Sequence, residues 1–164
     1  DPAPVAMMLH RLHRASVPQG SFRNAPNGSA AVLADAMRIY ALGAIPPDPG
    51  VAPVKAVPIH ADAVSGNVLA TVGGPILIDW QCPAMGDPVE DLCTFLSPAM
   101  MWLYSGRVPA ADYAEAFLRA YPDAAVVARA RVMVPLYRYR IAAHCAWKAA
   151  RGDAEYAEAL KLEL

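Results

Sequence analysis

One stretch of sequence decides the fold: His60-Ala61-Asp62-Ala63-Val64-Ser65-Gly66-Asn67-Val68-Leu69, followed closely by Ile76-Leu77-Ile78-Asp79-Trp80. Asp62 and Asn67 precede two short apolar runs, and Asp79 comes directly after them. An aspartate can accept the proton of a hydroxyl group, and an asparagine with a second aspartate can hold Mg²⁺ against nucleotide phosphates. This set of groups, in this order, predicts phosphoryl-transfer chemistry.

The segment between these polar groups predicts a β-hairpin. Residues 68–72 and 75–78 are apolar and rich in β-branched side chains, and Gly73-Gly74 supplies a two-residue turn. In that register Val68 faces Asp79, so the hairpin brings Asn67 and Asp79 to its open end. An ideal pleat would point these two side chains to opposite faces, so the open end must depart from regular strand geometry if both touch one metal.

The rest of the chain predicts helices joined by loops. Ser29 is the expected N-cap of the second helix and Gly43 its expected terminator, and the prolines between residues 46 and 53 predict an extended connection. A kink is expected at Pro135, and Pro109 separates two helices. The expected helices are 5–15, 30–42, 89–97 with a continuation to 104, 110–121, 123–151 and 153–162, with a loop at 17–28 and a short strand at 54–59.

Three groups of motifs follow one another in a fixed order, and the central stretch supplies the second of them. They are Leu9-His10-Arg11-Leu12-His13, the pair His60-Ala61-Asp62 and Asn67-Val68-Leu69 with Ile78-Asp79-Trp80, and Gly86-Asp87-Pro88-Val89-Glu90-Asp91-Leu92. Together they resemble the aminoglycoside phosphotransferase and choline kinase-like family, relatives of the protein kinases. The resemblance covers roughly the whole chain. It implies an α+β, mainly α fold, namely the C-terminal (large) lobe of a protein kinase-like enzyme with a short catalytic hairpin and helices around it.

The resemblance implies roles for individual residues. Asp62 would be the catalytic aspartate near the acceptor hydroxyl, and Asn67 and Asp79 would bind Mg²⁺, with ATP as co-substrate. The residues that would support the site structurally are His60, Asp87 and Asp91. Ala61 stands where the family usually has glycine, a departure that bears on loop rigidity rather than on the chemical groups.

The resemblance also implies a domain organisation. We expect a single domain over residues 1–164, with leading helices and a Pro-rich loop at 1–53, a catalytic and metal-binding segment at 54–92, and a helical substrate-side part at 93–164. The chain shows no Gly-rich loop with a following strand lysine, so we expect a large-lobe fragment from which the N-terminal ATP-binding lobe is absent.

The helical part supplies candidates for the acceptor pocket, namely Trp102, Trp147, Asp153 and Glu155. Acids and aromatic faces suit a cationic acceptor such as an aminoglycoside or choline, whereas core packing and solvation explain the same residues without a ligand. The long helix also carries a basic side that predicts a solvated face, with an acidic partner or phosphate as the alternative. Its members are Arg129, Arg131, Arg138, Arg140, Lys148 and Arg151.

Composition excludes several classes. The 164 residues are 56% hydrophobic and 18% charged, which suits one folded domain, and the net charge of −1 gives no general attraction to nucleic acid or membrane. Cys82, Cys93 and Cys145 form no C-x-x-C pair, which favours a reducing compartment, and we expect a cytoplasmic protein. His10 and His13 lack a third ligand, which favours a helix surface or a lobe interface over a metal site.

The favoured hypothesis is an ATP-dependent kinase that phosphorylates a hydroxyl of a small molecule, with aminoglycoside-like, choline-like and sugar acceptors all open. The alternative is a non-catalytic kinase-like binding or scaffold protein that lacks the nucleotide lobe. A Ser- or Cys-hydrolase is disfavoured because the sequence contains no G-x-S-x-G motif. The sequence indicates no oligomeric state.

Overall fold

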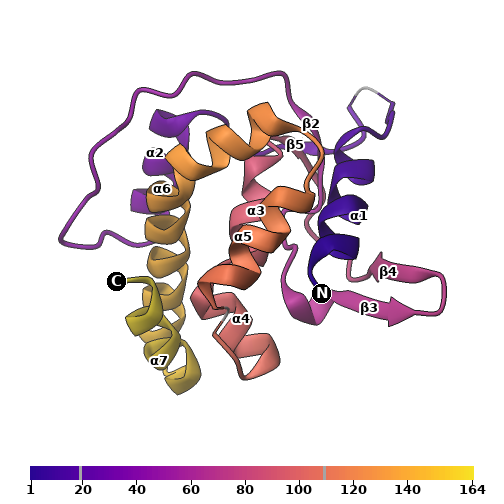
Figure 1. The fold of residues 1–164 in the computed structure, drawn as a ribbon. Helices are drawn as coiled ribbons and strands as arrows, with labels where there is room; N and C mark the ends of the chain where they lie inside the picture. The colour runs from indigo at the N-terminus through magenta and orange to yellow at the C-terminus, as the bar shows by residue number, and fades with distance from the viewer. Residues whose placement is uncertain (19, 109) are drawn as a thin grey trace.

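The computed structural model describes residues 1–18, 20–108 and 110–164. Gln19 in the first expected loop, and Pro109 between two expected helices, lie outside the described residues. Helices dominate the structure, and small sheets lie beside them (Figure 1). The fold is therefore α+β and mainly helical, as the sequence predicts. The helices are α1 (Ala3–His13), α2 (Ser29–Ile39), α3 (Val89–Phe95), α4 (Pro98–Ser105), α5 (Ala111–Ala120), α6 (Ala124–Ala149) and α7 (Ala154–Glu163).

Five short strands form two sheets in the described chain. In the first sheet β5 lies in the centre, parallel to β1 and antiparallel to β2, and in the second β3 and β4 form an antiparallel hairpin. Strands of two or three residues give no periodic signal, so the sequence does not predict β1 and β5. The strands are β1 (Arg23–Asn24), β2 (Val57–Ile59), β3 (Val68–Thr71), β4 (Gly74–Leu77) and β5 (Ala84–Gly86).

The hairpin is present, but the predicted register is wrong. Thr71 pairs with Gly74, so Val72 and Gly73 form the turn in place of Gly73-Gly74. Gly74 has a φ of 104° and lies directly after the two turn residues. A hairpin whose turn is followed by a residue with positive φ favours glycine there, because glycine has no Cβ atom to clash. The Thr71 hydroxyl accepts from the Gly73 N–H at 3.2 Å and donates to the Gly74 carbonyl at 2.7 Å, which holds the turn.

The observed register changes what lies opposite the first metal-ligand candidate. Val68 pairs with Leu77 rather than with Asp79. One step beyond the ladder, the Ile78 N–H donates to the Asn67 carbonyl at 3.0 Å. Asp79 therefore follows a residue that is bonded directly to Asn67.

Two element ends near the N-terminus differ from expectation. Ser29 is the first residue of α2 rather than its N-cap, because its hydroxyl accepts from the Val51 N–H at 2.8 Å and holds the proline-rich connection instead. The helix ends at Ile39, before Gly43, because the backbone of Tyr40 is extended. The strand expected from residue 54 begins only at residue 57, because the backbone of Val54 pairs with the Asn27 side chain.

The predicted continuation of the helix from residue 89 to residue 104 is interrupted. α3 ends at Phe95 and α4 begins at Pro98, with the Ser97 hydroxyl accepting from the Met100 N–H at 3.0 Å as an N-cap. Proline cannot continue a helix but suits its first turn, which explains the break. By contrast, α6 runs through Pro135 as one helix, and Figure 1 shows it bent between its orange first part and its golden second part.

The hydrophobic core lies between α1, α2, α3, α5 and α6. Leu9, Leu92, Phe117, Leu136 and Tyr137 are almost wholly buried there, and each contributes about 1.5–3 kcal/mol through its removal from water. A second cluster lies under the loop that follows β2, where residues of that loop, α4, α6 and α7 pack together. In the part of the chain that the structure describes, no helix combines the length and the apolar character needed to cross a bilayer.

Candidate functional site

The loop that follows β2 is anchored by a buried carboxylate. Asp91 is wholly buried at the start of α3, and its two oxygens accept from the N–H groups of His60 and Ala61, each at 2.8 Å. His13 adds a third contact, from its Nε2 to Asp91 at 3.0 Å, while its Nδ1 lies 2.7 Å from the Tyr121 hydroxyl. His13 is therefore a buried link between α1, α3 and the loop, and of the two predicted places, a helix surface or a lobe interface, it does not occupy the surface.

Ala61 adopts a left-handed backbone conformation, which glycine adopts without strain. Its φ of 60° lies in the left-handed region, which is strained for a residue with a Cβ atom. The two hydrogen bonds from residues 60 and 61 to Asp91 hold the backbone there.

Asp62 and Asn67 are brought into direct contact. The Asn67 amide Nδ2 donates to the backbone carbonyl of Asp62 at 2.9 Å and to its carboxylate at 3.1 Å. Burial raises the pKa of the Asp62 carboxyl, the hydrogen bond from Asn67 opposes this, and the negative charge of Asp79 adds to the rise. Because Nδ2 faces Asp62, the amide oxygen of Asn67 is left for another ligand.

Asp79 follows the hairpin in an unusual backbone conformation. Its φ is also 60°, and its side chain is exposed. Next to it, the indole of Trp80 packs edge-on against His60 with ring centroids 4.6 Å apart. His60 is wholly buried, and its Nε2 lies 3.0 Å from the Ile78 carbonyl, so it ties the loop to the residue before Asp79.

Asp87 lies at the junction of β5 and α3. It is wholly buried, and it accepts from the Arg129 Nε at 2.7 Å and from the Val89 N–H at 3.1 Å. The first contact fixes α6 against this junction, and the second caps the start of α3. Asp87 therefore acts on the folded structure around the site rather than inside its cavity.

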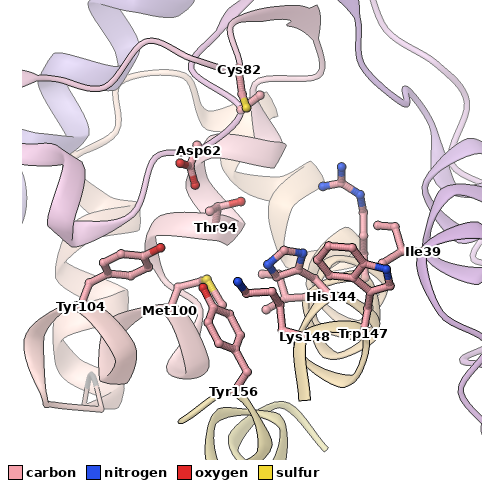
Figure 2. A pocket seen from close by; sticks show the side chains of 13 residues that line it. Ile39, Asp62, Cys82, Thr94, Met100, Tyr104, His144, Trp147, Lys148 and Tyr156 are labelled. Carbon is pink, nitrogen blue, oxygen red and sulfur yellow. The ribbon is translucent and has the colours of Figure 1, made fainter. Parts of the chain in front are cut away.

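A cavity of about 410 Å³ opens beside Asp62 (Figure 2). Asp62 and Thr94 approach it from one side and His144, Trp147 and Lys148 from the other. Of the four residues predicted for an acceptor pocket, Trp147 lines it. The other three lie elsewhere among the described residues: Trp102 packs in the second core cluster, Asp153 lies 3.5 Å from Lys148, and Glu155 is exposed on α7.

Several lining residues are not predicted from the sequence. Arg140, His144 and Lys148 lie one helical turn apart along α6, and this i, i+4 spacing is the signal that could have placed them on one face. Tyr104 reaches the cavity because Gly66 has no side chain. A Cβ atom at Gly66 would lie 2.6 Å from a ring carbon of Tyr104.

The metal-ligand candidates are few in number. The described residues contain no cluster of three or more His, Cys, Asp or Glu side chains that could hold a metal. Asn67 and Asp79 together offer an amide and a carboxylate, which is the oxygen chemistry that Mg²⁺ prefers. Mg²⁺ takes one or two protein ligands when phosphates and water complete its shell, so this donor set fits it.

Comparisons with known proteins place the chain in a family. The model of the phosphotransferase enzyme family (APH) matches residues 4–132, and the chain belongs to this family. A solved structure of a choline/ethanolamine kinase family protein from Mesorhizobium loti superposes with a TM-score of 0.63 at 18% identity. The match covers 98% of this chain and 61% of that one, so the chain spans less than two thirds of its structural neighbour. No curated protein matches the chain by sequence.

These findings support the resemblance seen in the motifs. The family model matches residues 4–132, which contain all of these motifs. The structural neighbour, at its low identity, supports the helix-rich α+β fold.

Proposed function

We propose that this chain is the large lobe of a kinase that transfers the γ-phosphoryl group of ATP to a hydroxyl of a small molecule. The observation that carries the proposal is the contact between Asn67 and Asp62 at the cavity, with Asp79 one residue beyond the Ile78–Asn67 hydrogen bond. Asp62 itself lines a space that can admit an acceptor, and the amide and the second acid reach it through these contacts.

Asp62 is proposed to act on the acceptor hydroxyl. Its carboxylate orients the hydroxyl and takes its proton as the oxygen attacks the γ-phosphorus. The bond from phosphorus to the acceptor oxygen forms while the bond to the bridging oxygen of ATP breaks, and ADP leaves with that electron pair. The Asn67 amide holds the carboxylate in place through its hydrogen bond at 3.1 Å.

Asn67 and Asp79 are proposed as the protein ligands of Mg²⁺. The metal, when bound, would neutralise negative charge on the phosphates. The backbone bond between Ile78 and Asn67 fixes the distance between the two ligand positions, and the His60 ring braces the same residue from the other side.

The lobe assignment is part of the proposal. Residues 1–53 would lead into the site, residues 54–92 would carry it, and residues 93–164 would form its acceptor side. The match covers only 61% of the choline/ethanolamine kinase family structure, and this supports a further lobe beyond the matched region. ATP would then bind between this lobe and a small lobe that is not part of the chain.

The test is a transfer assay on the intact protein with ATP, Mg²⁺ and a panel of hydroxylated acceptors, read as ADP release. Asp62→Asn should lower kcat by about 10²- to 10⁴-fold, which is the usual contribution of a positioned base. Asp112→Asn, at an exposed residue of α5, is the matched control. Full activity of Asp62→Asn would refute the base assignment.

A second measurement addresses the metal and the alternative function. Asp79→Ala should abolish the Mg²⁺-dependent part of nucleotide binding in calorimetry, and unchanged Mg²⁺ dependence would refute the ligand assignment. An intact protein that folds and binds partners but transfers no phosphate to any acceptor would support the non-catalytic kinase-like scaffold instead.

A further inference from the structure

The cavity is lined by more basic than acidic side chains. Among the described lining residues Asp62 is the one carboxylate, while Arg140, His144 and Lys148 form a stripe along the same face of α6. Figure 2 shows His144 and Lys148 directed into the cavity across from Asp62. A molecule that presents its hydroxyl to Asp62 therefore meets basic groups at its other end.

Lys148 is the basic group that keeps hydrogen-bond donors for a ligand. Arg140 is already held, since its guanidinium lies 2.6 Å from Asp35 and 3.2 Å from Glu90. Among the described residues Lys148 has one acidic neighbour, Asp153 at 3.5 Å, and both side chains are about one third exposed (35% and 34%), so water screens their attraction. An ammonium group carries three donors, which leaves donors for a ligand.

His144 is suited to donate a hydrogen bond as a neutral ring. Burial lowers its pKa, and the positive charges of Lys148 and Arg140 lower it further. Its ring lies between two aromatic side chains, stacked 5.9 Å from Trp147 and edge-on 5.7 Å from Tyr156. It can place one N–H beside Lys148 without adding a charge.

Two of the aromatic side chains that line the cavity, Trp147 and Tyr156, already face cations of this chain. The Arg151 guanidinium lies 3.9 Å from the centre of the Trp147 ring, and the Lys148 ammonium lies 5.0 Å from that of Tyr156. The nearby acid Asp153 faces Lys148. A quaternary ammonium or polyamine acceptor would find neither a free aromatic face nor a free carboxylate at this end of the cavity.

We propose that the acceptor is an anionic hydroxylated small molecule, whose carboxylate or phosphate group binds to Lys148 and His144 while its hydroxyl faces Asp62. The inference rests on the proposed kinase function for the role of the hydroxyl. The anion site itself rests on the lining residues alone, so it can be tested without catalysis.

The test measures fragment binding to the 164-residue chain by calorimetry at low ionic strength. The probes are inorganic phosphate and acetate, which separate the two kinds of anion, and tetramethylammonium as the cationic fragment. We expect saturable binding of phosphate, acetate or both, weakened about tenfold in Lys148→Met because a charge-assisted contact is lost. Lys161→Met, which removes an exposed lysine paired with Glu158 at 2.7 Å, is the matched control and should bind like the parent.

Two further variants test whether anion binding depends on the charge at residue 148, and a stability measurement excludes misfolding as the cause of any loss. Lys148→Arg keeps the charge and should retain anion binding. Asp153→Asn removes the one acidic neighbour of Lys148 and should strengthen anion binding about threefold. Urea denaturation of each variant reports whether the fold is retained.

The proposal would be overturned by any of three results: no saturable binding of either anion, binding that Lys148→Met leaves unchanged, or tighter binding of tetramethylammonium than of both anions. Its failure is distinct from failure of the kinase assignment. Transfer from ATP to cationic acceptors alone would refute the anionic acceptor and support the kinase assignment. Anion binding without any phosphate transfer would support the anion site and refute the kinase assignment.

Discussion

Replacing Asp91 by asparagine should destabilise the protein by about 3 kcal/mol. Its buried carboxylate accepts from the N–H groups of His60 and Ala61 and contacts His13 Nε2, at 2.8, 2.8 and 3.0 Å. A hydrogen bond to a charged group contributes about 1.5–3 kcal/mol, and a buried donor without a partner costs about 1–3 kcal/mol. Asparagine has one oxygen where Asp91 has two, so its NH₂ group must face one of the backbone N–H groups and one bond is lost.

The assay is urea denaturation followed by circular dichroism at neutral pH. With a slope of about 2 kcal/mol per molar urea, the loss corresponds to a midpoint lower by about 1.5 M at unchanged slope. Asp112→Asn, on the exposed surface of α5, should change the free energy of unfolding by less than about 0.5 kcal/mol.

A double-mutant cycle with His13→Ala tests the network itself. Because His13 and Asp91 are in direct contact, the two changes should be non-additive by about 0.5–3 kcal/mol. A loss below about 0.5 kcal/mol for Asp91→Asn, or additive changes in the cycle, would refute the reasoning that Asp91 anchors the loop.

Three further changes follow from the geometry. Ala61→Gly should raise the free energy of unfolding by about 0.5 kcal/mol. Glycine relieves about 1–2 kcal/mol of left-handed strain, and this exceeds the cost of the added freedom of the unfolded chain, about 0.4–1 kcal/mol. A lower melting temperature of the variant would contradict this. Gly66→Ala should cost about 1–3 kcal/mol by overpacking against Tyr104, and Tyr104→Ala in the same chain should recover most of that loss in urea denaturation. Burial raises the pKa of Glu90 from 4.5 to about 7, so the folded state binds the extra proton between these values and stability falls as pH rises through them. Relative to Glu90→Gln, the parent should therefore lose about 3 kcal/mol between pH 4.5 and pH 8, and a pH-independent difference in urea titrations would exclude the shift.

The helices and the order of the motifs could be predicted because they depend on local signals. Apolar spacing, prolines and glycines indicate α1, α5, α6 and α7 to within a few residues. The hairpin register could not be predicted, because it depends on which of two adjacent glycines takes the positive φ, and Gly74 does so. The sequence Gly73-Gly74 is compatible with either choice.

The long-range ion pairs could not be predicted from the sequence either. The basic side of α6 predicts a solvated face, and this is wrong for Arg129 and Arg140, whose side chains are only 15% and 20% exposed. Arg140 meets Asp35 across 105 positions of sequence, and Arg129 meets Asp87 across 42. Nothing in the local pattern distinguishes an arginine that faces water from one that closes such a pair.

The backbone strain of the molecule is concentrated at the candidate site. Among the described residues other than glycine, Ala61 and Asp79 are the two with positive φ, and they flank the segment that carries Asp62 and Asn67. Each such conformation costs about 1–3 kcal/mol and persists only where the surroundings over-determine it. Asp91 holds the backbone of Ala61 in this conformation through a hydrogen bond. The hydrogen bonds of His60 and Asn67 to Ile78 hold the backbone next to Asp79. The fold is therefore less stable than it could be, and in return Asp62 and its neighbours are held in fixed positions. Such preorganisation is typical of a catalytic site, and it favours a phosphotransferase over a scaffold.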